Sequence, residues 1–482
     1  MDLQDNGICF GDTAFNTPMA NENQQEDSES IHLDSNGRLT FSPNDPSNPQ
    51  NWSFARKVFL SFIAILLVVN ATFASSGPSA VLSGISSSLH VSTTASSLTV
   101  TLFVLANAYG PLVWAPLSEH FGRQRVFQTT FALYVVFNFL CAFAPNFGAL
   151  LAGRLLSGVF AREAMGLFTI AIFTGPTLGP VVAGFLQLKK DWRWFFYVLL
   201  WLGGATLPLV FMLPETRPNI VLLQKARRIR KQDPTQKDLQ APAEASGQGL
   251  GALFKTALTR PWRIFIDPIE ICCAAYTALI YMLLYMLFAI YPLVFRQMRG
   301  WNAGVSELPL LGVVVGSIFG GCGVLYTTHT THKKLATGHK SVPEDRLPLA
   351  CVGAVLFPIS MFWFAWTAQY NSIHWIVPTL AGVPLAASFL FVSVAYLNYI
   401  ADCYGPYAAS ALAANAVCRA FCGAAAPLFT PYMFEALTVA GGGSLVAGLG
   451  CLLAVAPFVF VKYGAQIRAR SKFASSVAAS SE

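Results

Sequence analysis

One stretch of the sequence decides the fold: Trp194-Phe-Phe-Tyr-Val-Leu-Leu-Trp-Leu-Gly-Gly-Ala-Thr-Leu-Pro-Leu-Val-Phe-Met-Leu213. It contains no charged residue. A helix of about 20 residues is ~30 Å long, which matches the hydrocarbon core of a bilayer. Similar apolar blocks recur along the chain, and they do not alternate at period two as the strands of an outer-membrane barrel do. The sequence therefore predicts an all-α integral membrane protein.

The composition of the whole chain agrees with this prediction. Of the 482 residues, 54% are hydrophobic and 11% are charged, whereas soluble domains carry about 25% charged residues. So few charges cannot cover a water-facing surface, which disfavours a soluble enzyme, a nucleic-acid binder and a disordered protein. The lipid bilayer is thus an expected partner and nucleic acid is not.

Twelve apolar blocks can be placed as spans, six on either side of a polar stretch. They cover residues 57–76, 95–117, 126–144, 148–161, 164–186, 194–213, 268–292, 307–327, 347–368, 373–400, 407–434 and 441–462. The chain is therefore expected to have an N-terminal tail (1–56), an N-terminal six-helix bundle (57–213), a central loop (214–267), a C-terminal six-helix bundle (268–462) and a C-terminal tail (463–482).

The loop charges predict the orientation of these spans. Lys and Arg cluster at 123–125, 225–231, 333–346 and 468–472, whereas the loops near 77–94, 145–147 and 369–372 contain none. Cytosolic loops carry an excess of basic residues, so both termini and the central loop are expected in the cytosol, although Lys189, Lys190, Arg296 and Arg299 are exceptions. The acidic tail has no signal-peptide pattern and is expected to be disordered.

The fourth block is too short for a comfortable crossing. Residues 148–161 supply ~21 Å of helix at 1.5 Å per residue before the charged pair Arg162-Glu163. A ~30 Å core is longer than that. Either this span is irregular, or the chain crosses only eleven times and the topology changes downstream.

A loop motif joins the second and third blocks: Gly110-Pro-Leu-Val-Trp-Ala-Pro-Leu-Ser-Glu-His-Phe-Gly-Arg-Gln-Arg125. Gly122 permits a tight turn, and Arg123 can pair with Glu119 or interact with helix carbonyls at the membrane surface. Taken alone, the motif is also compatible with an ordinary basic loop.

A helix motif lies inside the fifth block: Gly175-Pro-Thr-Leu-Gly179-Pro-Val-Val-Ala-Gly184-Phe. Small residues at this spacing let two helices approach closely, and Pro176 and Pro180 predict an interrupted helix. A single pair of glycines would indicate only helix packing.

Charged residues inside apolar spans are rare and usually functional. Arg154 in the fourth span and Arg419 in the eleventh are the clear basic cases, although either could instead form a structural pair or extend toward the interface. Acidic candidates are scarce, because Glu270 opens the seventh span and Asp402 ends the tenth. A buried carboxylate that carries protons is not established by the sequence.

Polar and aromatic residues in the spans are candidates for a substrate and proton pathway, although packing is the commoner role of such aromatics. Tyr281 and Tyr285 are four residues apart and share one helix face. A cavity of this kind would suit flat, amphipathic organic compounds. The candidates are Asn107, Tyr109, Tyr276, Tyr281, Tyr285, Asn398, Tyr399 and Asn415.

Several functions lack the residues that they require. No G-x-x-x-x-G-K-[ST] motif is present, which excludes an ATP-driven pump unless another subunit supplies the motor. No filter-like repeat indicates a channel, and no cluster at metal-ligand or catalytic spacing lies in the spans. Nearly all of the ten Cys lie in apolar runs, where they are expected to be small buried hydrophobes. We expect no enzyme activity, no metal and no cofactor.

The two motifs resemble signatures of the major facilitator superfamily. The loop resembles the pattern G-x-L-x-D-R-x-G-R, with Ala115, Glu119 and His120 in place of the Gly, the Asp and the first Arg. Gly175–Phe185 resembles the motif of its proton-coupled antiporters, and Arg154 with Gly158 matches the R-x-x-x-G of the fourth span. Further landmarks are Asn48–Trp52, Pro214–Thr216, Pro343–Leu347, His374–Pro378, Tyr407–Asn415 and Lys462–Gly464.

The resemblance covers roughly residues 46–473 and is closest to fungal drug:proton antiporters with twelve spans. It implies two six-helix bundles, a small organic substrate such as a drug, toxin or secondary metabolite, protons as the coupling ion, and a monomer in the plasma membrane. The loop at Glu119, Gly122 and Arg123 would act as a gate. The alternatives are a polyamine or nutrient carrier of the same fold, a transport-dead receptor or regulator, and an inactive truncated form.

The fourth span departs from this family. By comparison with a full span and turn, roughly 20 residues are missing after Phe160, through a mispredicted intron, a splice form or a real deletion. We therefore expect this 482-residue chain to be poorly inserted or inactive.

Overall fold

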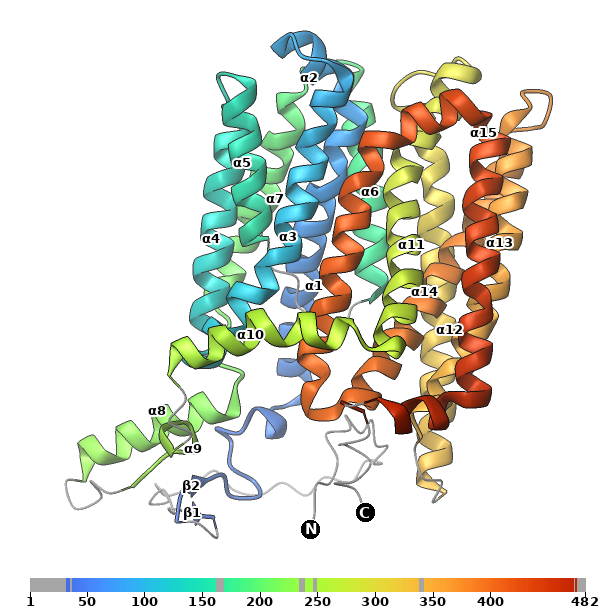
Figure 1. The fold of residues 1–482 in the computed structure, drawn as a ribbon. Coiled ribbons are helices and arrows are strands. Elements are labelled where there is room, and N and C mark those ends of the chain that lie inside the picture. Colours follow the sequence, from blue (N-terminus) through green and yellow to red (C-terminus); the bar gives the residue numbers. More distant parts are fainter. Residues whose placement is uncertain are drawn as a thin grey trace, which may run out of the picture.

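A computed structural model of the chain describes residues 32–34, 37–161, 169–233, 239–245, 249–337, 342–471 and 473–474. Most of these residues lie in long helices that run side by side (Figure 1). The two charged residues Arg162 and Glu163 lie outside the described part of the chain. The prediction of an all-α membrane protein is confirmed, since the described residues form long apolar helices and their only sheet consists of two short strands outside the bundle.

In the described residues, the first half of the bundle contains seven α-helices and one short 3-10 helix. They are α1 (Phe54–Ser76), η2 (Gly77–Val81), α2 (Leu82–Leu89), α3 (Thr93–Phe121), α4 (Arg123–Ala142), α5 (Phe147–Phe160), α6 (Thr169–Gln187) and α7 (Arg193–Phe211). The second half forms α11 (Pro268–Tyr291), η4 (Pro292–Met298), η5 (Val305–Leu310), α12 (Leu311–Ala336), η6 (Pro343–Arg346), α13 (Leu347–Gln369), α14 (Ile376–Tyr404), η7 (Gly405–Tyr407) and α15 (Ala408–Arg470).

The helices are long and apolar enough to cross a membrane. In the described residues, 8 helical segments meet this requirement, and the last of them, Ile376–Arg470, contains both α14 and α15. Large apolar side chains cover the outside of the bundle, such as Trp201 at 63% and Leu452 at 72% exposure. An apolar outer surface suits lipid rather than water.

The long helix α15 is two helices joined at Thr438. The φ of 63° and ψ of 173° at this residue are not helical. The side-chain oxygen of Gln369 accepts hydrogen bonds from the backbone N–H groups of Val439 and Ala440 at 2.9 and 3.1 Å, which caps the second helix. The break falls between the two spans predicted at 407–434 and 441–462.

Helix α5 is the short member of the bundle. It contains 14 residues, and its first turn is capped by Asn146, whose side chain accepts a hydrogen bond from Ala149 N. The indole N–H of Trp114 in α3 donates to the carbonyl of Val159 at 2.7 Å, near the last residue of α5. The predicted short span is therefore a short helix, and α3 continues beyond its end.

Two hydrophobic cores hold the helices together. One contains buried residues of α1 to α7, such as Leu150 and Phe196. The other is formed mainly by α11 to α15 but also includes Val104 of α3 and Phe173 of α6. Helices α3 and α6 therefore connect the two halves of the chain.

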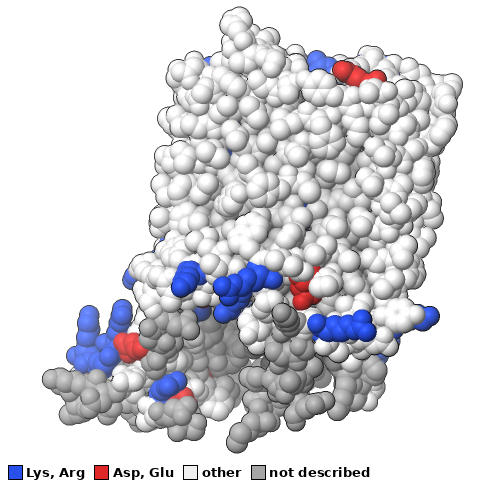
Figure 2. All heavy atoms as spheres, in the orientation of Figure 1, with Lys and Arg blue, Asp and Glu red and all other residues white. Residues whose placement is uncertain are grey.

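Most Lys and Arg side chains gather at one end of the bundle, which we call the charged end (Figure 2). The elements outside the bundle lie here: β1 (His32–Leu33), β2 (Leu39–Thr40), η1 (Pro49–Asn51), α8 (Pro218–Gln232), α9 (Pro242–Ala245) and α10 (Leu250–Phe265). Helix α10 lies across the ends of α3 and α15 (Figure 1).

The described part of the N-terminal tail is folded, in contrast to the disorder expected for residues 1–56. Leu39 is 1% exposed in a small core with Ala226 of α8. The buried Asp45 pairs with Lys225 of α8 at 2.8 Å. Burial raises the pKa of Asp45, but hydrogen bonds from Lys225 and Ser47 outweigh this and leave the pKa below its ordinary value. The described part of the tail packs on α8 because α8 supplies an apolar face and a cation, which no local pattern in the tail reveals.

Candidate functional site

Arg154 is held at the centre of the first half. Its side chain is 0% exposed. Nε donates to the carbonyl of Thr99 in α3 at 2.7 Å, and Nη2 donates to the carbonyl of Ala74 in α1 at 2.8 Å. The guanidinium also lies 4.1 Å from the ring centroid of Phe103. Among the described residues it has no carboxylate partner, and Nη1 has no hydrogen-bond partner.

Two of the predicted tyrosines, Tyr281 and Tyr285 of the second half, are connected to this arginine through α1. The hydroxyl of Tyr285 in α11 is 3.0 Å from the hydroxyl of Ser75 in α1. Tyr281 packs against Tyr285 edge to face at 5.2 Å, and the guanidinium of Arg419 lies 4.9 Å from the Tyr281 ring. We call Ser75, Arg154, Tyr281, Tyr285 and Arg419 the central cluster. It spans both halves of the chain and combines two cations with aromatic rings.

The helix motif brings α6 against α1. A Cβ at Gly175 would lie 1.9 Å from the Thr72 hydroxyl oxygen, and one at Gly179 would lie 2.7 Å from the carbonyl oxygen of Phe73. Glycine is therefore required at both positions for this helix contact.

The prediction of an interrupted helix at this motif is wrong, because α6 continues through both prolines. Pro180 has no N–H to donate to the carbonyl of Pro176. The hydroxyl of Ser76 donates to that carbonyl instead, at 2.6 Å. The replacement hydrogen bond satisfies the freed backbone group and joins α6 to α1.

The remaining pathway candidates are spread over several places. Asn107 is half-buried in α3, Tyr109 packs edge to face on Phe421 at 6.0 Å, and Asn398 is exposed on α14. Glu270 and Asn415 are both 0% exposed, and the side-chain oxygen of Asn415 accepts a hydrogen bond from the hydroxyl of Thr277 at 3.2 Å. The structure thus brings only part of the predicted set into the central cluster.

Glu270 is more deeply buried than its place at the start of a span suggests. It lies in the first turn of α11, and neither carboxylate oxygen has a partner with hydrogen-bond geometry. Asn415 is its polar neighbour, and Asp267 is its charged neighbour. A buried carboxyl group without a cation favours its neutral, protonated form.

The loop motif is organised by a residue outside it. Glu215, which follows α7, accepts hydrogen bonds from the backbone N–H groups of Arg123 and Gln124 at 3.0 and 3.2 Å, and from those of Thr216 and Arg217 at 3.0 and 2.9 Å. This carboxylate therefore caps the first turn of α4. Gly122 has a φ of 93°, and a Cβ there would lie 2.2 Å from a carboxylate oxygen of Glu215.

Glu119 and Arg123 do not form the pair that the sequence allowed. Both side chains are exposed, and the salt bridges of the described residues do not include them. Glu215 was visible in the sequence only as part of the landmark Pro214–Thr216. Its role depends on the ends of α4 and α7 meeting, which only the fold shows.

A corresponding ion pair joins helix ends in the second half. Arg468 at the end of α15 binds both oxygens of Glu344 at 2.9 and 2.8 Å. Arg346 pairs with Asp402 at 3.0 Å, so the acid at the end of the tenth predicted span is used in a surface contact rather than in the centre of the bundle.

The two halves are in contact at the end of the bundle opposite the charged end. Thr94 and Tyr432 share a hydrogen bond of 2.6 Å, and Thr101 donates to the carbonyl of Ala424 at 2.8 Å. At the last turn of α6, a Cβ on Gly184 would lie 2.6 Å from the carbonyl oxygen of Ala303, just before η5. These contacts close that end between the halves.

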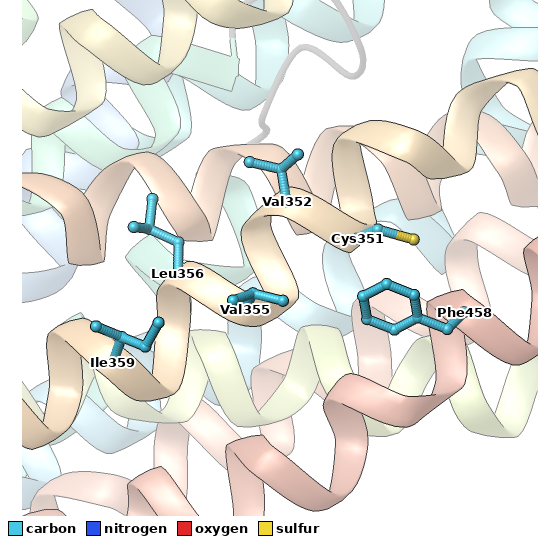
Figure 3. A pocket seen from close by; sticks show the side chains of 6 residues that line it. All are labelled: Cys351, Val352, Val355, Leu356, Ile359 and Phe458. Atoms are coloured by element: carbon cyan, nitrogen blue, oxygen red, sulfur yellow. The ribbon is translucent and has the colours of Figure 1, made fainter.

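A surface groove of about 450 Å³ lies on the outside of the second half (Figure 3). It is lined by Cys351, Val352, Val355, Leu356 and Ile359 of α13 and Phe458 of α15. Val352 and Ile359 are 56% and 59% exposed. The groove is apolar and faces outward, so it contributes nothing to the central cluster. No group of three His, Cys, Asp or Glu that could hold a metal occurs among the described residues.

Comparison with known proteins identifies relatives of the chain. The family model described as Major Facilitator Superfamily matches residues 62–162 and 162–427, two segments that meet where the fourth span is short. "MFS-type efflux pump MFS2" of Trichophyton rubrum is 37% identical over 90% of this chain and 76% of the relative. "Major facilitator superfamily multidrug transporter mdrA" of Aspergillus fumigatus is 38% identical over 91% and 76%.

A third relative is a "Citrinin biosynthesis cluster MFS transporter" of Monascus ruber, 34% identical over 89% of this chain and 91% of the relative. Among solved structures, the proton:xylose symporter XylE bound to 6-bromo-6-deoxy-D-glucose aligns with a TM-score of 0.59 and 16% identity. It covers 85% of this chain and 97% of that one. At this identity the likeness shows the fold alone.

Proposed function

The chain belongs to the major facilitator superfamily, and from this premise we propose that it exports a small organic compound, a secondary metabolite, toxin or xenobiotic, in exchange for protons. The observation that carries the proposal is the similarity over about nine tenths of the chain to relatives named as efflux and multidrug transporters. It is a membrane transporter and not an enzyme.

We propose the central cluster as the substrate site. It lies where α1, α3 and α5 of the first half meet α11 and α15 of the second, which is where transporters of this architecture alternate access. Aromatic faces on Tyr281 and Tyr285 suit a flat organic molecule. Because the Tyr285–Ser75 hydrogen bond crosses between halves, a rocking motion of the halves would break it and admit substrate.

For the proton, we propose Arg154 as the group that tunes the coupled charge. Its buried guanidinium has no carboxylate partner among the described residues, so it raises the local positive potential that an entering proton must overcome. Glu270 is the proposed proton-binding carboxyl of the charged end, because burial without a cation favours its neutral form.

Gating is proposed to reside at the joint of Gly122 and Glu215. The capped first turn of α4 and the end of α7 move as one unit while Glu215 holds them. Glu119 and Arg123 are free to make contacts in another state of the cycle, because both side chains are exposed. We propose further that the charged end faces the cytosol and that the protein acts as a monomer in the plasma membrane.

The test is efflux of rhodamine 6G from preloaded yeast cells that lack their own drug exporters. Two forms are expressed: the chain itself and a chain with a helix-length segment inserted after Phe160. We expect energy-dependent efflux above the empty-vector rate, stronger for the extended form and abolished by a proton uncoupler. A panel of azoles and spermidine, scored by growth, separates drug export from polyamine transport.

The matched control is Arg193→Ala, which removes an arginine from the surface pair with Asp191. This variant is expected to export at the rate of its parent. If neither form exports dye, azole or spermidine although both are present at the cell surface, the transporter proposal fails and a transport-dead receptor is favoured. Efflux that persists with the uncoupler would contradict proton coupling alone.

A further inference from the structure

A second buried carboxyl group lies at the contact between the two halves, at the end opposite the charged end. Glu307 belongs to η5, the short helix that precedes α12, and is 2% exposed. Its Oε2 has no hydrogen-bond partner. Nothing in the sequence marks this residue, because an acid at the start of an apolar block is typical of an ordinary interfacial position.

Glycines bring α6 and η5 together around this group. A Cβ on Gly184 of α6 would lie 2.9 Å from Cγ of Glu307, and one on Gly304 would lie 2.7 Å from Cδ1 of Phe185. α6 belongs to the first half of the chain and η5 to the second. Glu307 is therefore buried by the closure of this end, and a separation of the halves would expose it to water.

The charges around Glu307 cannot keep it ionised in the closed state. Among the described elements, the main neighbours of η5 are α6, α11, α12, α14 and η4. α6 has no charged residue, and the charged residues of α11, α12 and α14 lie at their far ends, near Glu270, Lys333 and Asp402. Arg296 of η4 interacts with Glu307 electrostatically, but its side chain is exposed, so water screens it.

We propose that Glu307 is a proton-binding site of the outer gate, so that closing this end of the transporter takes up one proton from the outside. In the open state the hydrated carboxylate is ionised, with Arg296 beside it. Closure transfers the carboxyl group into the α6–η5 contact, where an ionised carboxylate without a partner is strongly disfavoured. One external proton is therefore bound to the carboxylate before the halves meet.

This proposal deepens the proposed function, on which it rests for the direction of the proton. A proton bound from outside would favour the return of the empty exporter by stabilising its closed outer gate, and it would leave to the outside when that gate reopens. Because closure binds one proton, the ratio of closed to open protein depends on pH. Above the pH range in which Glu ordinarily ionises, this ratio falls by up to about tenfold for each pH unit. The sign follows because the closed state binds the proton and the open state does not.

The test is hydrogen exchange by mass spectrometry on the full chain in lipid nanodiscs without substrate. In the closed state the amides of Ser306 and Glu307 donate to the carbonyls of Asn302 and Gly304 at 3.0 and 3.2 Å. After correction for the intrinsic pH dependence of exchange, their protection in the wild type is expected to fall as pH rises, by up to tenfold per unit. Glu307→Gln and the apolar Glu307→Met should remove this dependence and stay protected.

The matched control is Glu435→Gln, which neutralises an exposed carboxylate near the same end and should keep the wild-type pH dependence. The proposal is overturned if wild-type protection does not change with pH, or if Glu307→Gln and Glu307→Met retain the wild-type dependence. Hydrogen exchange can be measured without transport, so the two proposals can fail separately. If the protein fails the dye-efflux assay but shows this exchange pattern, the proposed function is refuted and the Glu307 proposal is supported.

Discussion

At the scale of single residues, Arg154 shows how a cation is kept inside the bundle. Inserting a charged residue at mid-membrane costs about 2.5–3.5 kcal/mol on translocon scales. Here the guanidinium donates hydrogen bonds to the backbone carbonyls of Thr99 and Ala74 and lies over the ring of Phe103. Hydrogen bonds to carbonyls do not neutralise a charge, so the positive potential remains in the site.

We predict that Arg154→Ala abolishes efflux while leaving the protein in the membrane, and that Arg154→Lys recovers little. Alanine removes the charge and its two hydrogen bonds, at about 1.5–3 kcal/mol for each bond to a charged group, and Lys cannot reproduce the planar fork that reaches both carbonyls. Dye efflux normalised to surface abundance measures this. Wild-type efflux by Arg154→Ala would show that the arginine is structural only.

Glu215 and Glu119 allow a matched comparison at the gate. We predict that Glu215→Gln lowers the thermal stability of the purified protein and slows transport, because it weakens four hydrogen bonds to a charged acceptor, for a loss of about 1.5–3 kcal/mol. Glu119→Gln should leave stability unchanged and reduce turnover more than substrate affinity. Equal stability of the two variants would refute the capping role of Glu215, and lost affinity at normal turnover would refute gating by Glu119.

The sequence reveals which residues are unusual but not what they contact. Arg154 stands out as a charge in an apolar run, yet its acceptors lie 55 and 80 positions earlier in the chain. Glu215 and Glu307 are unremarkable in the sequence, because an acid beside an apolar block is common at membrane surfaces. Their burial follows from contacts between helices that no local periodicity encodes.

At the scale of elements, α5 is the weak member of the fold. Helix α5 ends beside Trp114 of α3, whereas α3 continues to Phe121. At 1.5 Å per residue, the last ~10 Å of α3 therefore has no contact with α5. The helix length of 14 residues could be read directly from the sequence. The sequence could not show that the end of α5 would still be packed and capped by Trp114.

We predict that inserting a helix-length segment after Phe160 raises plasma-membrane abundance and efflux. The mismatch of ~9 Å against a ~30 Å core costs fractions of a kcal/mol per Å, which can total several kcal/mol. Surface biotinylation and dye efflux of both forms measure the effect. If the shorter form performs equally well, the fourth span tolerates truncation and the predicted topology has to be redrawn.

The contact between the tail and α8 is a second element with a testable charge. The pKa of Asp45 is lowered in the folded state, so its contribution to stability is present above the unfolded value of 3.8 and is lost as pH falls through the lower, folded value. At neutral pH we therefore predict that Asp45→Asn releases residues 37–52 from α8. Faster limited proteolysis of this segment, by a few-fold, would confirm it, whereas unchanged proteolysis would show that the apolar contact of Leu39 is sufficient.

At the scale of the whole molecule, the fold follows from composition and block length, whereas the conformational state does not. Apolar blocks predict the helices, and the charge pattern predicts which ends share a side (Figure 2). The contacts that close one end, such as Thr101 with Ala424 and Gly184 with Ala303, join residues of both halves and depend on how these halves dock. A transporter needs this docking to be reversible, and these contacts combine small residues and single hydrogen bonds with apolar side chains such as Val104 and Phe173.

The central claim is that this chain moves an organic compound and protons in opposite directions. The most direct measurement uses vesicles that contain the purified protein, in both the 482-residue and the extended form, and that are preloaded with rhodamine 6G. We predict that dye leaves faster when the outer solution is made acidic, that the vesicle lumen acidifies at the same time, and that an ionophore which collapses the proton gradient stops both. Dye release by both forms that is unchanged by the gradient, or no release by either form, would contradict the account.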